Sequence, residues 1–313
     1  MAGPRLRAFR ARAVSRAFAV IRAAGRHIPL PLGRKFGRAL GTLAWHVARR
    51  ERRKALAHIA IAYPEWSDAQ RRGAIRRMFR HLGESLFEIV WLVNLDEKTL
   101  AKTTVIEGMD EVKRLTSSGR GIVTFTGHCG NWEWLARTVA LCGVPVTTMQ
   151  RERDDAEMND FIVQLREGAG IRTIDRGSAS SAREMIQALR RGGGVLAFLI
   201  DQNIRAESAK VPFFGTPALT PIGPVKLAIR TGAPIVSMFI RRGDDGMQYV
   251  TVNPPFETSP DDDPIAVTAR VTREIEDAIR RAPEQWVWMH DRWRERPKWE
   301  VSPPPVPPSS LSS

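Results

Sequence analysis

The sequence predicts an α/β fold in which helices flank a mixed, mainly parallel sheet, with a basic amphipathic helical region at the N-terminus. Two patterns support this prediction. After Gly108, short apolar runs alternate with longer amphipathic runs, an order that makes successive strands parallel and places helices on both faces of the sheet. Before that point, residues 34–95 show the apolar spacing of helices. A chain of 313 residues is long enough to bury a full core of this kind.

The individual elements follow from the same periodicities. Strands are expected at residues 121–126, 144–150, 171–175, 195–200, 234–240 and 248–252. Helices are expected at residues 36–49, 50–62, 68–95, 132–142, 156–167, 180–191, 222–231 and 264–281. Ser67 is the predicted N-cap of the third helix, while Thr220 and Pro221 are predicted to begin the helix that Gly232 ends. Residues 282–293 are expected to pack on the core as a closing strand or helix.

The positive charge of the chain is confined to one end. Residues 1–56 carry the whole formal charge of +14, because they hold 15 lysines and arginines and only one acidic residue. A basic patch of this kind indicates attachment to an anionic partner, for which anionic lipid and nucleic acid are the candidates. Residues 57–313 are neutral and carry no nucleic-acid-reading motif, so the sequence disfavours nucleic acid.

Residues 1–25 are predicted to form a basic amphipathic helix that attaches the protein to a membrane. Its apolar positions at helical spacing are Leu6, Phe9, Ala13, Ala17, Val20, Ile21 and Ala24, and its arginines lie mostly elsewhere. Arginine side chains on such a helix reach anionic head groups. The alternative is a helix that packs on its own domain. No apolar run reaches the ~18 residues of a spanning helix, and no secretory signal is present. We therefore expect a peripheral or monotopic protein at the cytoplasmic face of the inner membrane.

The expected organisation has three parts. The attachment helix at 1–25 is followed by a single domain at 26–299, which comprises a helical part at 34–95 and an α/β core at 105–299. Residues 300–313 form a Pro/Ser-rich tail, predicted to be disordered. The only cysteines are Cys129 and Cys142, which indicates a reducing compartment. Six scattered histidines without ligand spacing predict no metal site.

The candidate catalytic residues lie where the first predicted strand ends. His128 stands in a loop between Gly127 and Gly130, which let the backbone turn sharply. Asn131 is a good N-cap, so Glu133 falls in the first helical turn, where the dipole favours a carboxylate. We expect His128 to fold back and hydrogen-bond Glu133, which would fix the tautomer of the imidazole and make it a base for an alcohol proton.

Charged residues follow three further predicted strands, namely Arg151, Arg176 and Asp201. In open α/β sheets, ligands bind outside the carboxyl ends of the strands, so these exits predict one shared site. Alternatives stay open at this point. His128 could be a buried structural histidine, and Cys129 could be a nucleophile activated by its neighbour.

Glu84 and Glu88 lie one turn apart on the third predicted helix. They could form a carboxylate pair. We interpret them instead as structural acids on the helix surface that pair with nearby arginines.

Ordered sequence blocks resemble the lipid A biosynthesis acyltransferase family, which includes lauroyl and myristoyl transferases and mycobacterial mannoside acyltransferases. Residues 127–134 are similar to the H-x-x-x-x-D/E motif of glycerolipid acyltransferases. The further blocks are residues 62–65, Arg151, Arg166, residues 201–203, residues 211–218, and residues 282–286 with His290 and Arg292. The resemblance spans roughly residues 20–297 and implies a glycerolipid-acyltransferase-like fold over the single domain.

The resemblance implies transfer of a fatty acyl group from a thioester to a hydroxyl of a membrane glycolipid, such as a lipid A precursor in lipopolysaccharide synthesis. The donor would be acylated acyl carrier protein or acyl-CoA, with no further cofactor. His128 would deprotonate the acceptor hydroxyl, and Glu133 would orient the imidazolium and balance its charge. The basic N-terminus would hold the enzyme against an anionic leaflet and attract an acidic carrier protein.

The resemblance also implies roles in substrate binding. Arg166 would stabilise the developing oxyanion or hold an acceptor phosphate. Asp201 matches an acidic position of the family, and Arg151 and Arg176 are candidates for binding anionic groups. The acceptor or acyl pocket would be shaped by Phe213, Phe214 and Gly215.

Two alternatives to this function remain. One is acyl transfer to another acceptor, which would be a phosphatidylinositol mannoside, a lysophospholipid or an amino-acid lipid. The other is a non-catalytic protein that binds an anionic membrane through its arginine-rich end.

Overall fold

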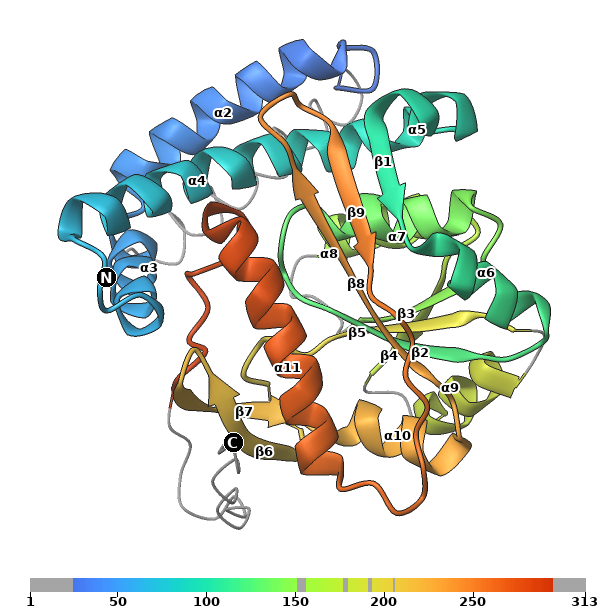
Figure 1. The fold of residues 1–313 in the computed structure, drawn as a ribbon. Helices are drawn as coiled ribbons and strands as arrows, with labels where there is room; N and C mark the ends of the chain where they lie inside the picture. Colours follow the sequence, from blue (N-terminus) through green and yellow to red (C-terminus); the bar gives the residue numbers. More distant parts are fainter. Residues whose placement is uncertain (1–24, 151–155, 177–179, 191–192, 205, 295–313) are drawn as a thin grey trace.

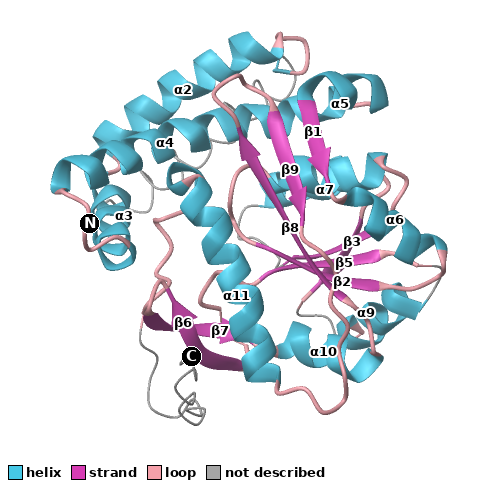
Figure 2. Cartoon of the chain, viewed as in Figure 1, coloured by secondary structure: helices cyan, strands magenta, loops and turns pink. Residues whose placement is uncertain are grey.

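The computed structural model describes residues 25–150, 156–176, 180–190, 193–204 and 206–294. The predicted attachment helix, apart from Gly25, lies outside these residues, as do Arg151 and the tail at 300–313. The division of the chain into these three parts therefore stays a prediction. Figures 1 and 2 show an α/β architecture in which helices surround a central sheet, as the sequence predicts.

The order of helices and strands matches most of the expected pattern. The α-helices are α2 (Leu30–Val47), α3 (Arg49–Ala62), α4 (Asp68–Trp91), α5 (Glu97–Thr103), α6 (Met109–Ser117), α7 (Trp132–Leu141), α8 (Ala156–Glu167), α9 (Ser181–Arg190), α10 (Gly223–Thr231) and α11 (Pro264–Arg281). Two 3-10 helices are η1 (Leu92–Asn94) and η2 (Pro283–Gln285). The strands are β1 (Thr104–Glu107), β2 (Ile122–Thr126), β3 (Val146–Gln150), β4 (Arg172–Asp175), β5 (Val195–Leu199), β6 (Ser208–Phe213), β7 (Thr216–Pro221), β8 (Ile235–Arg242) and β9 (Gln248–Val252).

The main sheet has seven strands in the order β1-β9-β8-β2-β5-β3-β4. All neighbouring pairs are parallel except β8 with β9, which is antiparallel, so the predicted mixed, mainly parallel sheet is confirmed. In the parallel pair β2–β5, Val123 is opposite Leu196 and Thr126 is opposite Leu199. The carboxyl ends of β2 and β5 are therefore adjacent, at one edge of the sheet.

β2 is the central strand of the core. All five of its residues are buried, because it lies between β8 and β5 and has packed side chains on both faces. Such strands read as near-continuous apolar runs rather than as alternating ones. Its odd and even positions enter two hydrophobic clusters, with Val123 and Phe125 in one and Ile122 in the other.

Helices α2 and α4 pack against each other through glycines. A Cβ atom on Gly37 would lie 2.4 Å from the carbonyl oxygen of Gly83, and one on Gly41 would lie 2.1 Å from that of Phe79. The absence of side chains at these positions lets the two backbones approach closely (Figure 1). The predicted N-cap of α4 is confirmed, because Ser67 and Gln70 form a capping box. Within the residues described, no helix has both the length and the apolar character to cross a bilayer.

In the C-terminal half, one local prediction is wrong, and a second is right about packing on the core but wrong about secondary structure. Thr220 and Pro221 belong to β7 and pair with β6, so α10 begins later, at Gly223. Residues 282–294 do pack on the core, where Trp286 and Trp288 are fully buried. They form η2 and irregular backbone rather than a closing strand or long helix.

Candidate active site

His128 and Asp201 meet at the adjacent ends of β2 and β5. The imidazole Nδ1 lies 2.7 Å from Oδ1 of Asp201, and the backbone N–H of His128 donates to Oδ2 at 2.7 Å. The indole Nε1 of Trp286 also donates to Oδ2, at 2.7 Å. Three donors therefore fix both oxygens of one carboxylate, which in turn fixes the orientation of the imidazole.

Asp201 is held in its ionised form. Its side chain is inaccessible to solvent, and burial alone would raise its pKa. The charge of His128 and the hydrogen bonds from His128 and Trp286 outweigh burial and lower the pKa of Asp201 to about 2. An ionised Asp201 accepts a hydrogen bond from Nδ1–H, so Nε2 is the ring nitrogen left to take up a proton.

The His128 ring remains accessible. Its side chain is 20% exposed, and it stands edge-on to the Trp132 ring with the centroids 4.9 Å apart. Among the residues that the structure describes, Nε2 has no hydrogen-bond partner. An oriented imidazole with one free, accessible nitrogen can act as a general base.

The loop around His128 requires its glycines. Gly130 has φ +58°, and a Cβ atom there would lie 2.2 Å from the carbonyl oxygen of Ile240. A Cβ atom on Gly127 would lie 3.2 Å from Oδ2 of Asp201. The N–H of Gly130 donates to the carbonyl of Gln285 at 2.9 Å, which ties the loop to the segment that carries Trp286.

Glu133 occupies the predicted position but has a different partner. Asn131 caps α7 by accepting from the N–H of Trp134, and Glu133 lies in the first turn, as predicted. Both oxygens of Glu133 accept from Arg166, at 2.6 and 2.9 Å. Asp201, rather than Glu133, is thus the carboxylate hydrogen-bonded to Nδ1 of His128.

The Arg166–Glu133 pair is buried between α8 and α7. Arg166 also donates to Oε1 of Gln150 at 3.4 Å, and Gln150 donates to Asp175 at 3.2 Å. This chain of hydrogen bonds joins α7 to the ends of β3 and β4. Its effect is to hold Arg166 in a fixed position with its charge already balanced by Glu133.

The remaining predicted site residues that the structure describes are Arg176, Phe213, Phe214 and Gly215. Arg176 follows β4 at the edge of the sheet, and its N–H donates to the carbonyl of Gln150 at 2.9 Å. Phe213 and Phe214 are buried, and Phe213 packs on Trp286 with ring centroids 5.6 Å apart. Gly215 lies in the exposed turn between β6 and β7. Phe213 therefore packs against the indole that donates to Asp201, and contact of these residues with a substrate stays a prediction.

Cys129 does not have the environment of a nucleophile. Its thiol is buried, and burial, followed by the charge of Asp201, raises its pKa well above the ordinary value. Within the described part of the chain, no group of three or more potential ligands could hold a metal ion.

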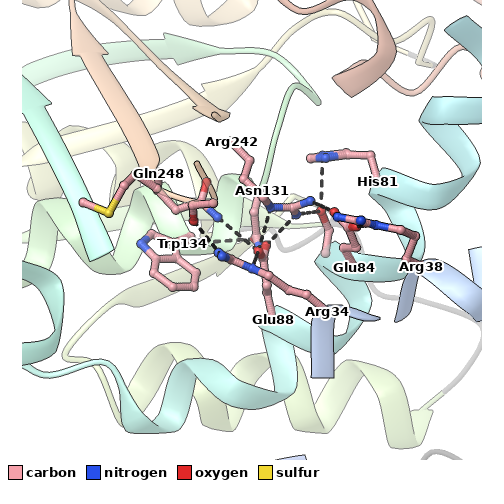
Figure 3. A network of polar contacts seen from close by, with 12 residues as sticks. Arg34, Arg38, His81, Glu84, Glu88, Asn131, Trp134, Arg242 and Gln248 are labelled. Carbon is pink, nitrogen blue, oxygen red and sulfur yellow. Dashed lines mark hydrogen bonds and ion pairs between the residues drawn. The ribbon is translucent and has the colours of Figure 1, made fainter. Parts of the chain in front are cut away.

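Glu84 and Glu88 are not helix-surface acids, so that part of their interpretation is wrong. Both are buried, and their arginine partners come from α2 and β8 rather than from nearby turns of α4 (Figure 3). Arg34 donates to Glu88 at 2.7 Å, and Arg242 donates at 2.8 and 2.9 Å. Burial would raise the pKa of Glu88, but the charges of these arginines outweigh it and lower the pKa.

The Glu88 carboxylate also supports the catalytic loop. Its Oε2 accepts from the side-chain amide of Asn131 at 3.0 Å, while the amide oxygen of Asn131 caps α7. Figure 3 shows Asn131 between Glu88 and Trp134. The N-cap of α7, Asn131, lies three residues after His128 and is therefore anchored in a buried ionic network.

Replacing Glu88 with alanine should lower the free energy of unfolding by about 3–5 kcal/mol, because Arg34 would lose its buried counter-charge and Arg242 would keep only Glu84. Urea denaturation measures this change. The matched control is Glu257→Ala, which breaks the exposed pair with Arg120 and should cost less than about 1 kcal/mol. Equal losses in the two variants would contradict the account.

His81 makes stability depend on pH. It is buried beside Ser85, and burial followed by the charge of Arg242 lowers its pKa to about 3. Since the unfolded chain takes up this proton at higher pH, stability is fully present above about pH 6.5 and is lost as the pH falls toward 3. Between about pH 7 and 5, the depressed pKa of His81 should lower the free energy of unfolding by about 2 kcal/mol. Urea denaturation at several pH values measures this effect. In His81→Gln, the free energy of unfolding should fall less steeply over this pH range than in the parent, and an unchanged slope against pH would contradict this assignment.

Sequence reasoning missed the roles of Trp286, Gln285 and Arg242. Trp286 was expected only to pack, yet it donates to Asp201. Gln285 clamps the backbone of Arg242, accepting from its N–H and donating to its carbonyl. The block at residues 282–286, which places Glu284 and Gln285 directly before Trp286, was the available signal.

The predicted family is confirmed by comparison with known proteins. Residues 5–295 match the family described as bacterial lipid A biosynthesis acyltransferase. The chain belongs to this family and is an acyltransferase.

Individual relatives match between two thirds and nearly nine tenths of the chain. The lipid A biosynthesis lauroyltransferase of Escherichia coli (strain K12) is 28% identical over 87% of this chain and 88% of its own length. The palmitoleoyltransferase of the same strain is 28% identical, over 88% and 89%. The phosphatidylinositol mannoside acyltransferase of Mycobacterium tuberculosis (strain H37Rv) is 26% identical, over 66% of each chain.

Proposed function

We propose that this acyltransferase moves a fatty acyl group from a thioester to a hydroxyl of a lipid A-type glycolipid, with His128 as the general base. The observation that carries the proposal is the hydrogen bond from His128 to the buried Asp201 at the carboxyl edge of the sheet. The named activities of the two Escherichia coli relatives support the glycolipid acceptor. The donor would be acylated acyl carrier protein or acyl-CoA.

In this mechanism, the acceptor hydroxyl donates its proton to Nε2 of His128 as its oxygen attacks the thioester carbonyl carbon. Asp201 stabilises the imidazolium through Nδ1 but does not itself take the proton. The tetrahedral intermediate collapses, the C–S bond breaks, and the imidazolium returns its proton to the leaving thiolate. The products are an ester and a free thiol, and no covalent acyl-enzyme is needed.

Arg166 and Glu133 take a supporting part in the proposal. Because Glu133 already neutralises Arg166, we assign to the pair the positioning of α7 and of the cation beside the site. Arg166 is then a preorganised cation that stabilises the oxyanion without moving during the reaction. Its second contact, with Gln150, limits its freedom further.

Membrane association is the second part of the proposal. The acceptor resides in a bilayer, and the first 56 residues carry the whole net charge of +14. Anionic lipid attracts such a segment by about 1 kcal/mol per basic residue near the surface. We propose that the enzyme works at the cytoplasmic face of the inner membrane.

A different acceptor is the competing function. The mycobacterial relatives are phosphatidylinositol mannoside acyltransferases, which favours that glycolipid as the second candidate. The choice between the two acceptors depends on the shape of the acceptor pocket.

The proposal is tested with purified protein, an acyl thioester and three separate acceptors in detergent micelles: a lipid A precursor with a free acyl-chain hydroxyl, a phosphatidylinositol mannoside and a lysophospholipid. Mass spectrometry should show one added acyl chain on the lipid A precursor. Exclusive acylation of either other acceptor would contradict the assigned substrate.

A further inference from the structure

Helix α2 carries an apolar face that is left exposed by the part of the chain that the structure describes. Five large side chains at spacings of three or four residues are 36–68% exposed, and this set is called the α2 stripe: Leu32, Phe36, Leu40, Leu43 and Val47. Their spacing places them on one side of the helix. A different side, with Gly33, Gly37 and Gly41, is buried against α4. α2 is thus amphipathic in an unusual way, because its packed side is made of glycines and its exposed side of large apolar residues.

Several cations border this stripe. Lys35 is exposed on α2, and exposed Arg49, Arg50 and Arg53 follow directly in the first turn and a half of α3. Ahead of α2, residues 1–24 contribute six arginines and no acid. A large apolar patch with a cationic rim marks an interaction surface.

We infer that α2 is an interfacial helix whose stripe inserts into the acyl-chain boundary of an anionic bilayer while its basic rim contacts lipid phosphates. The inference rests on the membrane association proposed above and locates it on α2, in addition to the predicted helix at 1–25. An interfacial helix of this kind buries its apolar side about 5–10 Å below the head groups.

Charge decides between the possible occupants of the stripe. If residues 1–24 covered it, their arginines would lie against the cationic rim. A second copy of the chain would bring two such rims together. Both arrangements place like charges side by side, whereas anionic lipid offers the opposite charge to the rim and an apolar phase to the stripe.

The position of α2 suits this role. Figure 1 shows α2 on the outside of the molecule, along α4. From α2, the largely buried Arg34 bonds to Glu88 of α4, and the exposed Arg38 bonds to Glu84. Glu88 in turn holds Asn131 at the start of α7. Insertion of α2 would therefore fix the catalytic loop, through two rigid contacts, at a set height above the bilayer.

The first test is sedimentation of the full-length protein with vesicles of phosphatidylglycerol and phosphatidylethanolamine, and with vesicles of phosphatidylcholine alone. The double variant Phe36→Ser with Leu43→Ser should partition into the anionic vesicles at least about tenfold less than the parent. The control variant, Val93→Ser with Val105→Ser, alters exposed apolar residues outside α2. Its partitioning into the anionic vesicles should stay within about twofold of that of the parent. Equal partitioning of the stripe variant and the parent would overturn the inference.

A second measurement identifies the occupant. In a Cys142→Ser background, Leu43→Cys is labelled with an environment-sensitive nitrobenzoxadiazole group. Emission should be that of a water-exposed dye in buffer and should shift to the blue with anionic vesicles. Emission already blue-shifted in buffer and unchanged by vesicles would show that residues 1–24 or a second copy cover the stripe, and would overturn the inference.

Activity in micelles separates this inference from the proposed reaction. The stripe variant should keep the parent's rate of acyl transfer to acceptor dissolved in detergent. Loss of vesicle binding by the stripe variant, with its rate of acyl transfer in micelles intact, supports the inference. A parent protein that binds vesicles but transfers no acyl chain would contradict only the proposed acyl-transfer reaction.

Discussion

Replacing His128 with alanine should lower kcat/KM for acyl transfer by about 10²–10⁴-fold. Without the imidazole, no group at this position can take the proton of the acceptor hydroxyl as its oxygen attacks the thioester. The measurement is thiol release from the acyl thioester in the presence of acceptor, followed continuously. Binding of the acceptor should change little, because the contribution of a general base appears in the transition state.

The control for His128→Ala is a check that the variant keeps the fold of the parent. The ring is partly exposed and its loop is held by backbone contacts such as Gly130 to Gln285. The circular dichroism spectrum and the urea midpoint should therefore match those of the parent. A folded His128→Ala protein with activity within about threefold of the parent would rule out general-base catalysis by this residue.

The variant Asp201→Asn should lower kcat by about 10³-fold or more, although the asparagine keeps the size of the side chain. An amide has one acceptor oxygen where the carboxylate has two, and it offers a donor where Nδ1–H needs an acceptor. The imidazole would then favour the tautomer that leaves Nε2 protonated, and a protonated Nε2 cannot act as a base. Steady-state kinetics at several pH values measure this loss.

A matched control exists at the neighbouring strand exit. Asp175 ends β4, is exposed, and accepts from Gln150. Asp175→Asn should leave kcat within about twofold of the parent, because this carboxylate does not touch the imidazole. Comparable losses in the two variants would mean that the general charge of this edge, rather than the Asp201–His128 bond, supports catalysis.

Local sequence patterns were sufficient for most of the fold. The six strands predicted after Gly108 are all present, because each is a short apolar run bounded by turn residues. The hairpin of β6 and β7 was missed, since Pro212, Pro217 and Pro221 argue against strands. In the structure these prolines lie in a two-stranded sheet apart from the main one, where few ladder donors are required.

The partner of His128 could not be predicted from local pattern. Glu133 is five residues away and shares the loop, so spacing favours it. Asp201 is 73 residues away and reaches the imidazole only because β5 lies beside β2 in the sheet. Strand order follows from long-range packing, and a single sequence does not display it.

The burial of Glu88 could not be predicted either, because it also depends on long-range packing. A glutamate on an amphipathic helix is most often exposed, and only the approach of α2 and β8 encloses this one. Gly33, Gly37 and Gly41 were the available sequence signal, because a stripe of glycines at helical spacing indicates close packing of that face against another backbone.

The most direct test of the account is the tautomer of His128, measured by nitrogen-15 NMR of histidine-labelled protein at a pH where the imidazole is neutral. The account predicts a downfield Nδ1–H resonance and an unprotonated Nε2 in the parent protein. This pattern should disappear in Asp201→Asn and persist in Glu133→Gln. A protonated Nε2 in the parent, or a pattern that survives Asp201→Asn and disappears in Glu133→Gln, would contradict it.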